Sequence, residues 1–162
     1  MMSKKRSTKP IFVETISQNI FSILPLLKKR LLYIDIIQSE HDMPFSQIQV
    51  LSMLREKGSL SISEISSRLG IAKPNITPLV DKLIECRYVE RTRDIQDRRV
   101  VNIIILEQGR EKLAGIQKTI CDQIWEWGKD MSVAEFRELS DSIESVIRIL
   151  SKIHDHEDAV IE

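Results

Sequence analysis

The chain has 162 residues, of which 42% are hydrophobic and 30% charged, so it is long enough for one domain and too apolar for an intrinsically disordered chain. Residues 11–27, the most apolar stretch, are interrupted by polar side chains and by Pro25, which excludes a membrane span. The basic first ten residues are not followed by an apolar segment typical of a secretory signal. The net charge is zero, but residues 1–129 hold 21 basic and 15 acidic side chains, an excess of positive charge that suits a nucleic-acid partner.

The first part of the chain predicts a basic terminus followed by a long apolar helix. Residues 1–10 hold four basic side chains and no acid, and we expect a frayed end rather than an arm that contacts DNA. From Ile11 to about His41 the apolar residues recur every three or four positions, which is the helical period, and Pro25 should kink or split this helix. Its apolar stripe is wide, so we expect another chain to cover it.

Three shorter helices are predicted next, each with its own boundary signals. Ser46 is the expected N-cap of a helix over residues 47–56, which a Lys-Gly-Ser segment ends. Ser61 or Ser63 caps the second helix, and a glycine closes it. In the third, Pro74 stands in the first turn, where proline is tolerated. The side chains expected to face the core are Ile62, Ile65, Leu69, Leu79, Val80, Leu83 and Ile84.

A β-hairpin and two further helices complete the predicted order of elements. Residues 88–92 and 100–106 are β-rich, and the charged segment RDIQDRR between them is expected to form the hairpin tip. Residues 107–127 follow a helical period, and Ser132 is the expected N-cap of a last helix that runs to Ile153.

This order predicts a mainly α-helical protein with a small β-hairpin wing, an α+β fold in which a winged helix-turn-helix domain is flanked by N- and C-terminal dimerisation helices. The expected parts are a flexible basic N-terminus, an N-terminal dimerisation helix region, the winged helix-turn-helix DNA-binding domain, the C-terminal dimerisation helices and an acidic tail. They span residues 1–10, 11–44, 45–106, 107–155 and 156–162, respectively.

The two short helices over residues 61–83 have the arrangement of a helix-turn-helix, whose second helix enters the DNA major groove. Asn pairs well with adenine, Lys and Thr reach phosphates or bases, and an Arg at a hairpin tip can enter the minor groove. A helical hairpin with a solvated polar face would show the same pattern, but the charged hairpin that follows favours DNA binding. Ile76 is expected to face the core or a thymine methyl group. The candidate DNA-binding residues are Ser61, Ser63, Lys73, Asn75, Thr77, Lys82, Arg93, Asp97, Arg98 and Arg99.

The sequence resembles the MarR family of winged helix-turn-helix regulators over nearly its whole length. The resemblance is most specific in three segments: FSQIQVLSMLREKGSLSISEISSRLGI, KPNITPLVDKLIE and RDIQDRRVVNIIILEQGREKL. In the last segment, Asp97, Arg98 and Arg99 occupy the positions of the family's Asp-x-Arg wing tip. The resemblance implies a homodimer, joined through its terminal helices, that binds a pseudo-palindromic operator in double-stranded DNA, usually as a repressor. Many members release DNA on binding a small phenolic or lipophilic effector, or on cysteine oxidation.

Three positions depart from the family's pattern. Ile105-Leu106 stands where the family has Leu-Thr, so another group must cap the following helix. The glycine that usually ends the recognition helix is replaced around Cys86-Arg87, where a non-glycine residue must tolerate or avoid a left-handed conformation. Pro78 lies inside the recognition helix and removes one internal hydrogen bond, and a bend there would change how the helix enters the groove.

No redox centre, metal site or cofactor is predicted. Cys86 and Cys121 make no disulfide framework, which favours a reducing cytoplasm, and we expect both thiols to be buried and inert. The three histidines, His41, His154 and His156, lack further ligands at helical spacing and are expected to be solvated. No catalytic motif occurs, so we predict a protein that is not an enzyme. The alternative to a DNA-binding regulator is a winged helix that binds another protein and has no operator of its own.

Overall fold

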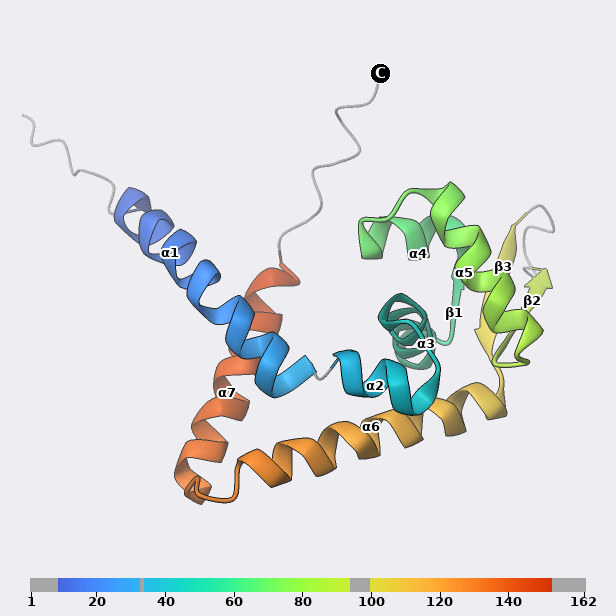
Figure 1. Ribbon diagram of the computed structural model, residues 1–162. Helices are drawn as coiled ribbons and strands as arrows, with labels where there is room; N and C mark the ends of the chain where they lie inside the picture. Colours follow the sequence, from blue (N-terminus) through green and yellow to red (C-terminus); the bar gives the residue numbers. More distant parts are fainter. Residues whose placement is uncertain (1–8, 33, 94–99, 153–162) are drawn as a thin grey trace, which may run out of the picture. The chain divides into compact units, whose positions relative to one another are not determined.

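The computed structural model describes residues 9–32, 34–93 and 100–152, and these residues are mainly helical with one small antiparallel sheet (Figure 1). They form two compact units, divided between Ile124 and Trp125 within the sixth α-helix. The predicted fold class is therefore confirmed. In chain order the elements are α1 (Lys9–Leu27), a π-helical turn (Lys28–Leu32), α2 (Ile34–His41), α3 (Phe45–Lys57), β1 (Ser59–Ser61), α4 (Ile62–Leu69), α5 (Lys73–Glu85), β2 (Val89–Arg93), β3 (Val101–Ile105), α6 (Glu107–Trp127) and α7 (Val133–Leu150).

The core of the first unit lies among α3, α4, α5 and the sheet, with Ile37 added from α2 and Leu113 and Ile116 from the first half of α6. Burying one such aliphatic side chain contributes roughly 1.5–3 kcal/mol, so this cluster fixes the mutual placement of the short helices. Of the seven residues predicted to face the core, Ile65, Val80 and Leu83 are buried. The other four are partly buried and pack against the core cluster: Ile62, Leu69, Leu79 and Ile84. The side chains with almost no exposure are Ile37, Val50, Leu51, Leu54, Ile65, Ile76, Val80, Leu83, Val89, Ile103 and Ile116.

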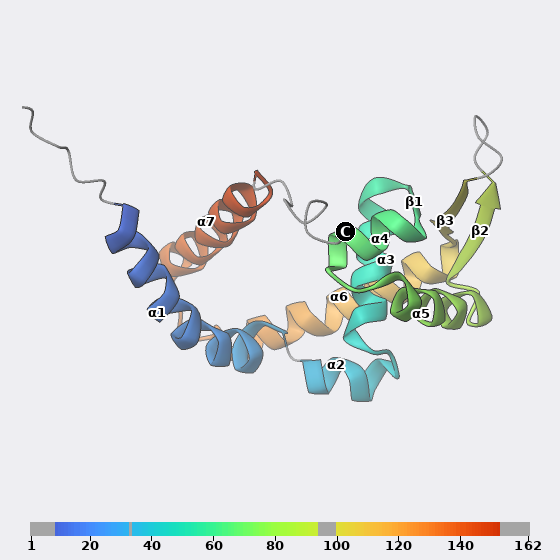
Figure 2. The same ribbon diagram turned by 90° about the horizontal axis from the view of Figure 1, so that it is seen from above.

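The sheet has three strands in the order β1-β3-β2, one more than the hairpin predicted from the sequence. In β1, Leu60 pairs antiparallel with Ile103 of the central strand, and in β2 Val89 pairs with Ile105. A three-residue strand is too short to show the alternation by which strands are recognised in a sequence, so only its pairing with β3 reveals it. Both views place α5 beside β2 (Figures 1 and 2).

The N-terminal helix is split, as Pro25 predicts: α-helical geometry ends at Leu27 and gives way to a π-helical turn before α2 begins. Proline has no N–H for an internal helix bond, and π-helical turns absorb such interruptions. No residue of α1 is buried within the chain, and its Phe21 is 77% exposed. The wide apolar stripe is thus present in the structure, and its cover by another chain stays a prediction.

Side-chain caps start two of the helices. Ser61 caps α4 and Ser132 caps α7, and each forms a reciprocal capping box with the glutamate three positions later, as the N-cap predictions require. Hydrogen bonds from the backbone N–H and the hydroxyl of Ser61 hold the pKa of Glu64 below its ordinary value. This cap is therefore complete above the ordinary glutamate pKa and weakens as the pH falls through the lowered one.

The predicted N-cap of α3 was wrong. Helix α3 starts at Phe45, so Ser46 lies inside the helix, and Pro44 stands at the cap without a side-chain hydrogen bond. The carbonyl oxygen of Pro44 accepts from the backbone N–H groups of Gln47 and Ile48 instead. Proline's fixed φ, here −59°, already places the chain at the entrance of a helix.

The end of α5 is closed by a left-handed residue that is not glycine. Arg87 has φ 58°; its N–H donates to Ile84 O at 2.9 Å, and the N–H of Tyr88 donates to Leu83 O at 2.9 Å. This pair of bonds is the Schellman closure of a helix, which usually places glycine at the left-handed position. The chain therefore tolerates the strained conformation here rather than avoiding it.

We expect Arg87→Gly to raise the free energy of unfolding by about 1 kcal/mol, because glycine adopts φ 58° without the penalty of a β-carbon. Urea denaturation would measure the change. The matched control is Arg110→Gly, the same substitution in the exposed first turn of α6, which should lower stability by up to about 1 kcal/mol. A loss of stability in Arg87→Gly would contradict the assignment of strain to this position.

Candidate nucleic-acid interface

The turn between α4 and α5 is fixed by backbone bonds from both sides. Gly70 adopts φ 61°, its N–H donates to Ser67 O at 3.2 Å, and the N–H of Ile71 donates to Ser66 O at 3.1 Å. In the other direction, the Ser66 hydroxyl donates to the carbonyl oxygen of Ile71 at 2.6 Å. The residues that lead into α5 are therefore held against α4, which gives the rigid two-helix unit that a helix-turn-helix requires.

Helix α5 has one buried face and one exposed face. Ile76, Val80 and Leu83 are buried at steps of four and three residues, which assigns Ile76 to the core and not to a thymine methyl group. The exposed side carries Lys73 and Asn75, whose side chains have no hydrogen-bond partner among the described residues. Four of the candidate residues, Lys73, Asn75, Thr77 and Lys82, are thus brought to solvent on one helix.

Two of these exposed side chains have partners within α5. The Thr77 hydroxyl donates to Lys73 O at 3.3 Å, which leaves its oxygen able to accept. The Lys82 ammonium lies 3.0 Å from Glu85 Oε2, and this hydrogen bond raises the pKa of Lys82. Both groups of the ion pair are solvent-exposed, and such pairs are weak enough for a phosphate to compete with them.

Pro78 lies inside α5, and the helix continues past it from Lys73 to Glu85. The residue lacks the N–H that would bond the carbonyl oxygen of Pro74, so one bond of the first turns is missing. Both prolines are exposed, so water can reach the orphaned carbonyl group.

The wing consists of β2 and β3, paired from Val89–Ile105 to Arg93–Val101. Arg93 is exposed at the end of β2, nearest the hairpin tip. The remaining tip candidates, Asp97, Arg98 and Arg99, lie outside the described residues. Their predicted entry into a minor groove therefore stays a prediction.

The two serine candidates differ in what their hydroxyl groups already do. Ser61 donates its hydroxyl to Glu64 Oε2 at 2.9 Å and accepts from the N–H of Glu64, so a phosphate contact would compete with the cap. Ser63 is exposed in the first turn of α4, where a phosphate would also be favoured by the helix dipole.

A salt bridge that sequence reasoning missed joins α5 to the wing. Arg91 Nη2 lies 2.5 Å from Asp81 Oδ1, and each side chain is about half exposed. Arg91 is on the same face of β2 as the buried Val89, two residues along the strand. The sequence did offer a signal for this salt bridge. Arg91 is a charged residue at a position that the alternation of the strand directs toward the core, and a charged residue there needs a partner.

The expectation of buried thiols was wrong: Cys86 and Cys121 are both exposed and free. Cys86 stands just beyond the last residue of α5, and Cys121 lies off the face of α6 that buries Leu113 and Ile116, so neither joins the core. Of the histidines, His41 is half-buried and its Nε2 lies 2.9 Å from Thr119 Oγ1; His154 and His156 lie outside the described residues.

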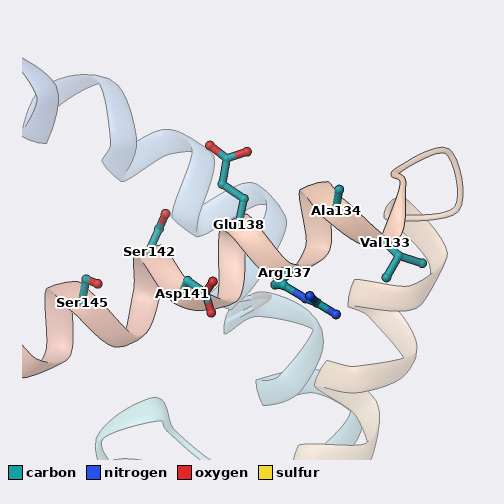
Figure 3. Close-up of a pocket in the computed structure, with 7 residues that line it drawn as sticks. All are labelled: Val133, Ala134, Arg137, Glu138, Asp141, Ser142 and Ser145. Carbon is teal, nitrogen blue, oxygen red and sulfur yellow. The ribbon is translucent and has the colours of Figure 1, made fainter.

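One hollow, of about 780 Å³, lies along α7 (Figure 3). All of its lining residues come from this one helix, so it is a helix surface and not an enclosed cavity. A smaller hollow of about 430 Å³ lies where α1 ends and α2 begins. Its lining residues are Pro25, Lys28, Lys29, Ile34, Asp35 and Ile36.

Comparison with known proteins gives matches to one family. Residues 41–100, which span the helix-turn-helix and part of the wing, match the model of the MarR family. The chain is 38% identical to the HTH-type transcriptional regulator TtmR of Methylorubrum extorquens, over 44% of this chain and 37% of that protein. It is 34% identical to the HTH-type transcriptional repressor MdtR of Bacillus subtilis, over 43% of this chain and 48% of that protein. The chain thus spans less than half the length of these two relatives.

The fold is shared with solved structures. A MarR family protein from Bacillus stearothermophilus superposes with a TM-score of 0.72, over 88% of this chain and 97% of that one, at 22% identity. This likeness extends beyond the segment that the family model matches. Residues 41–100 therefore resemble the MarR family, and the chain shares the fold of a solved MarR family protein.

Proposed function

We propose that this protein is a sequence-specific DNA-binding transcriptional regulator whose α5 lies in the major groove of an operator. The division of α5 into two faces carries the proposal. Ile76, Val80 and Leu83 hold the helix in the core, whereas Lys73 and Asn75 extend to solvent without partners among the described residues. A helix held in this way presents its N-terminal side chains to base edges without reorganisation.

Six of the ten candidate residues have an assigned role in this proposal. Asn75 reads a base, with adenine as its preferred partner, while Lys73 and Thr77 contact bases or orient the helix in the groove. Lys82 contacts a phosphate, and Arg98 and Arg99 at the hairpin tip enter the flanking minor groove. The DNA-binding domain is residues 45–106, between dimerisation regions at 11–44 and 107–155.

A homodimer is the assembly that the apolar surfaces support. Several large apolar side chains are exposed on α1, among them Ile16 and Ile20, and the same holds for α7, with Val146 and Ile147. Single exposed apolar residues are ordinary, but rows of them on helices mark interaction surfaces. A two-fold dimer would present two copies of α5 to half-sites about 10 bp apart. The relative MdtR is a repressor, and we propose repression here, in the cytoplasm, where the operator DNA lies.

A small effector is also part of the proposal. The hollow of about 430 Å³ at the junction of α1 and α2 has the size of a small-molecule pocket. Pro25 and Ile34 give it apolar surface, and Lys28 and Lys29 would favour an anionic or phenolic ligand. Its position in the predicted dimerisation region would allow a ligand to change the spacing of the two recognition helices.

The experiment that tests the function is a selection of bound duplexes from a random DNA pool, followed by titrations of the best sequence at several salt concentrations. We expect an inverted repeat with half-sites about one helical turn apart. The logarithm of the affinity should fall steeply with that of the salt concentration, with a slope of roughly −0.9 per phosphate neutralised. The lack of any enriched motif, together with a shallow slope, would favour the alternative, a winged helix that binds protein.

A further inference from the structure

Helix α5 carries two exposed carboxylates, Asp81 and Glu85, on the element proposed to enter the major groove. Charge alone predicts that each of them repels phosphate and weakens DNA binding. Their partners differ, however, in where they lie. Glu85 bonds to Lys82 on the same helix, at 3.0 Å, whereas Asp81 bonds to Arg91 on β2, at 2.5 Å.

The bond between Asp81 and Arg91 crosses from one DNA-binding element to the other. In the pairing of β2 with β3, Arg91 stands opposite Ile103, and the side chain of Ile103 is buried. The backbone at this point of the wing is therefore fixed to the core. The guanidinium group of Arg91 reaches beyond the core to the middle of α5. Arg93 follows two residues later on the same face of β2 and is the last residue of that strand.

Stability does not account for this salt bridge. About half of each side chain is exposed, and ion pairs with that exposure contribute little to the free energy of folding. A guanidinium–carboxylate bond is nevertheless directional, so it restricts the angle between the strand and the helix. The pair between Lys82 and Glu85 restricts nothing outside α5, and it occupies an ammonium group that could otherwise contact a phosphate.

We propose that Asp81 is a positioning residue of the DNA-binding surface: through Arg91 it holds the wing at the angle at which the wing and α5 contact DNA together. Glu85, by contrast, lowers DNA affinity because it holds Lys82. The inference rests on the proposed DNA-binding function. It predicts that neutralising Asp81 lowers the DNA affinity and that neutralising Glu85 raises it. Charge alone would predict a higher affinity in both cases.

The test uses the full-length protein, the selected duplex and the near-isosteric variants Asp81→Asn and Glu85→Gln. We expect Asp81→Asn to bind about tenfold more weakly and Glu85→Gln about threefold more tightly, with unchanged urea-unfolding midpoints. Asp81→Glu, which keeps the charge, should retain most of the affinity. Arg91→Gln should weaken binding as much as Asp81→Asn does, and the double variant should lose no more than either single variant.

A shortened duplex separates a wing effect from a general one. On a duplex cut back to the two half-sites, without the flanking base pairs that a wing would reach, wild type and Asp81→Asn should bind equally. The inference is overturned if wild type binds the full duplex with a steep salt slope and Asp81→Asn binds it as tightly or more tightly. It is also overturned if Asp81→Asn is equally weakened on both duplexes. Failure of the wild-type protein to bind any duplex would instead overturn the proposed function.

Discussion

Replacing Asn75 by alanine is expected to weaken binding to the selected operator about ten- to a hundredfold, while binding to an unrelated duplex stays almost unchanged. The reason is geometric. Asn75 is exposed in the first turn of α5, and its amide can donate to and accept from one base at the same time. Loss of one such pair removes discrimination between bases without removing positive charge. Fluorescence anisotropy titrations with the two duplexes would measure both affinities.

Two lysine variants provide the contrast for Asn75. Lys82→Ala should weaken binding to operator and unrelated duplex alike and make the salt slope shallower by about 1, because it removes one phosphate contact. Lys118→Ala removes the same charge from α6, where Lys118 pairs with Asp122, and should leave the slope unchanged. Equal losses of Asn75→Ala on both duplexes would show that Asn75 contacts the DNA backbone and does not read a base.

The parts of the fold that were predictable from the sequence are those fixed by neighbouring residues. Ser61 and Ser132 are each followed by a glutamate three positions later, and this local pattern marks the start of α4 and α7. The wrong N-cap prediction for α3 also comes from neighbouring residues. Ser46 could cap a helix, but Pro44 already sets the direction of the chain, so the helix begins before Ser46. Strand β1 could not be predicted because its cause, pairing with β3, lies far along the chain.

The candidate site divides along the same line. The exposed positions of Lys73 and Asn75 follow from the helical period of α5 and could be predicted. The bond between Asp81 and Arg91 could not, since it depends on the angle at which the chain leaves α5. That angle depends on the left-handed Arg87, at a helix end where the MarR family usually has glycine. The exposure of Cys86 depends on the same helix end.

The base of the wing is also held to α6 by a close approach that only glycine permits. Gly109 is buried in the first turn of α6, and a β-carbon there would overlap the carbonyl oxygen of Tyr88. The same carbonyl oxygen accepts from the N–H of Leu106 at 2.9 Å, so the backbone that enters β2 is bonded to the start of α6. This contact stands where the family has a threonine cap, and it joins the wing to the helix that follows it.

We therefore expect Gly109→Ala to lower the free energy of unfolding by about 1–3 kcal/mol, although alanine is the better helix former, because a backbone oxygen cannot rotate away as a side chain can. Gly115→Ala, in the exposed middle of the same helix, is the matched control. Its β-carbon would lie 3.7 Å from His41 Cε1, an ordinary contact, so helix propensity decides and stability should rise by roughly 0.5–1 kcal/mol. Urea denaturation of both variants measures the difference. Equal gains in the two variants would mean that α6 can move away from Tyr88 at no cost, and that the wing is not held at its base by this contact.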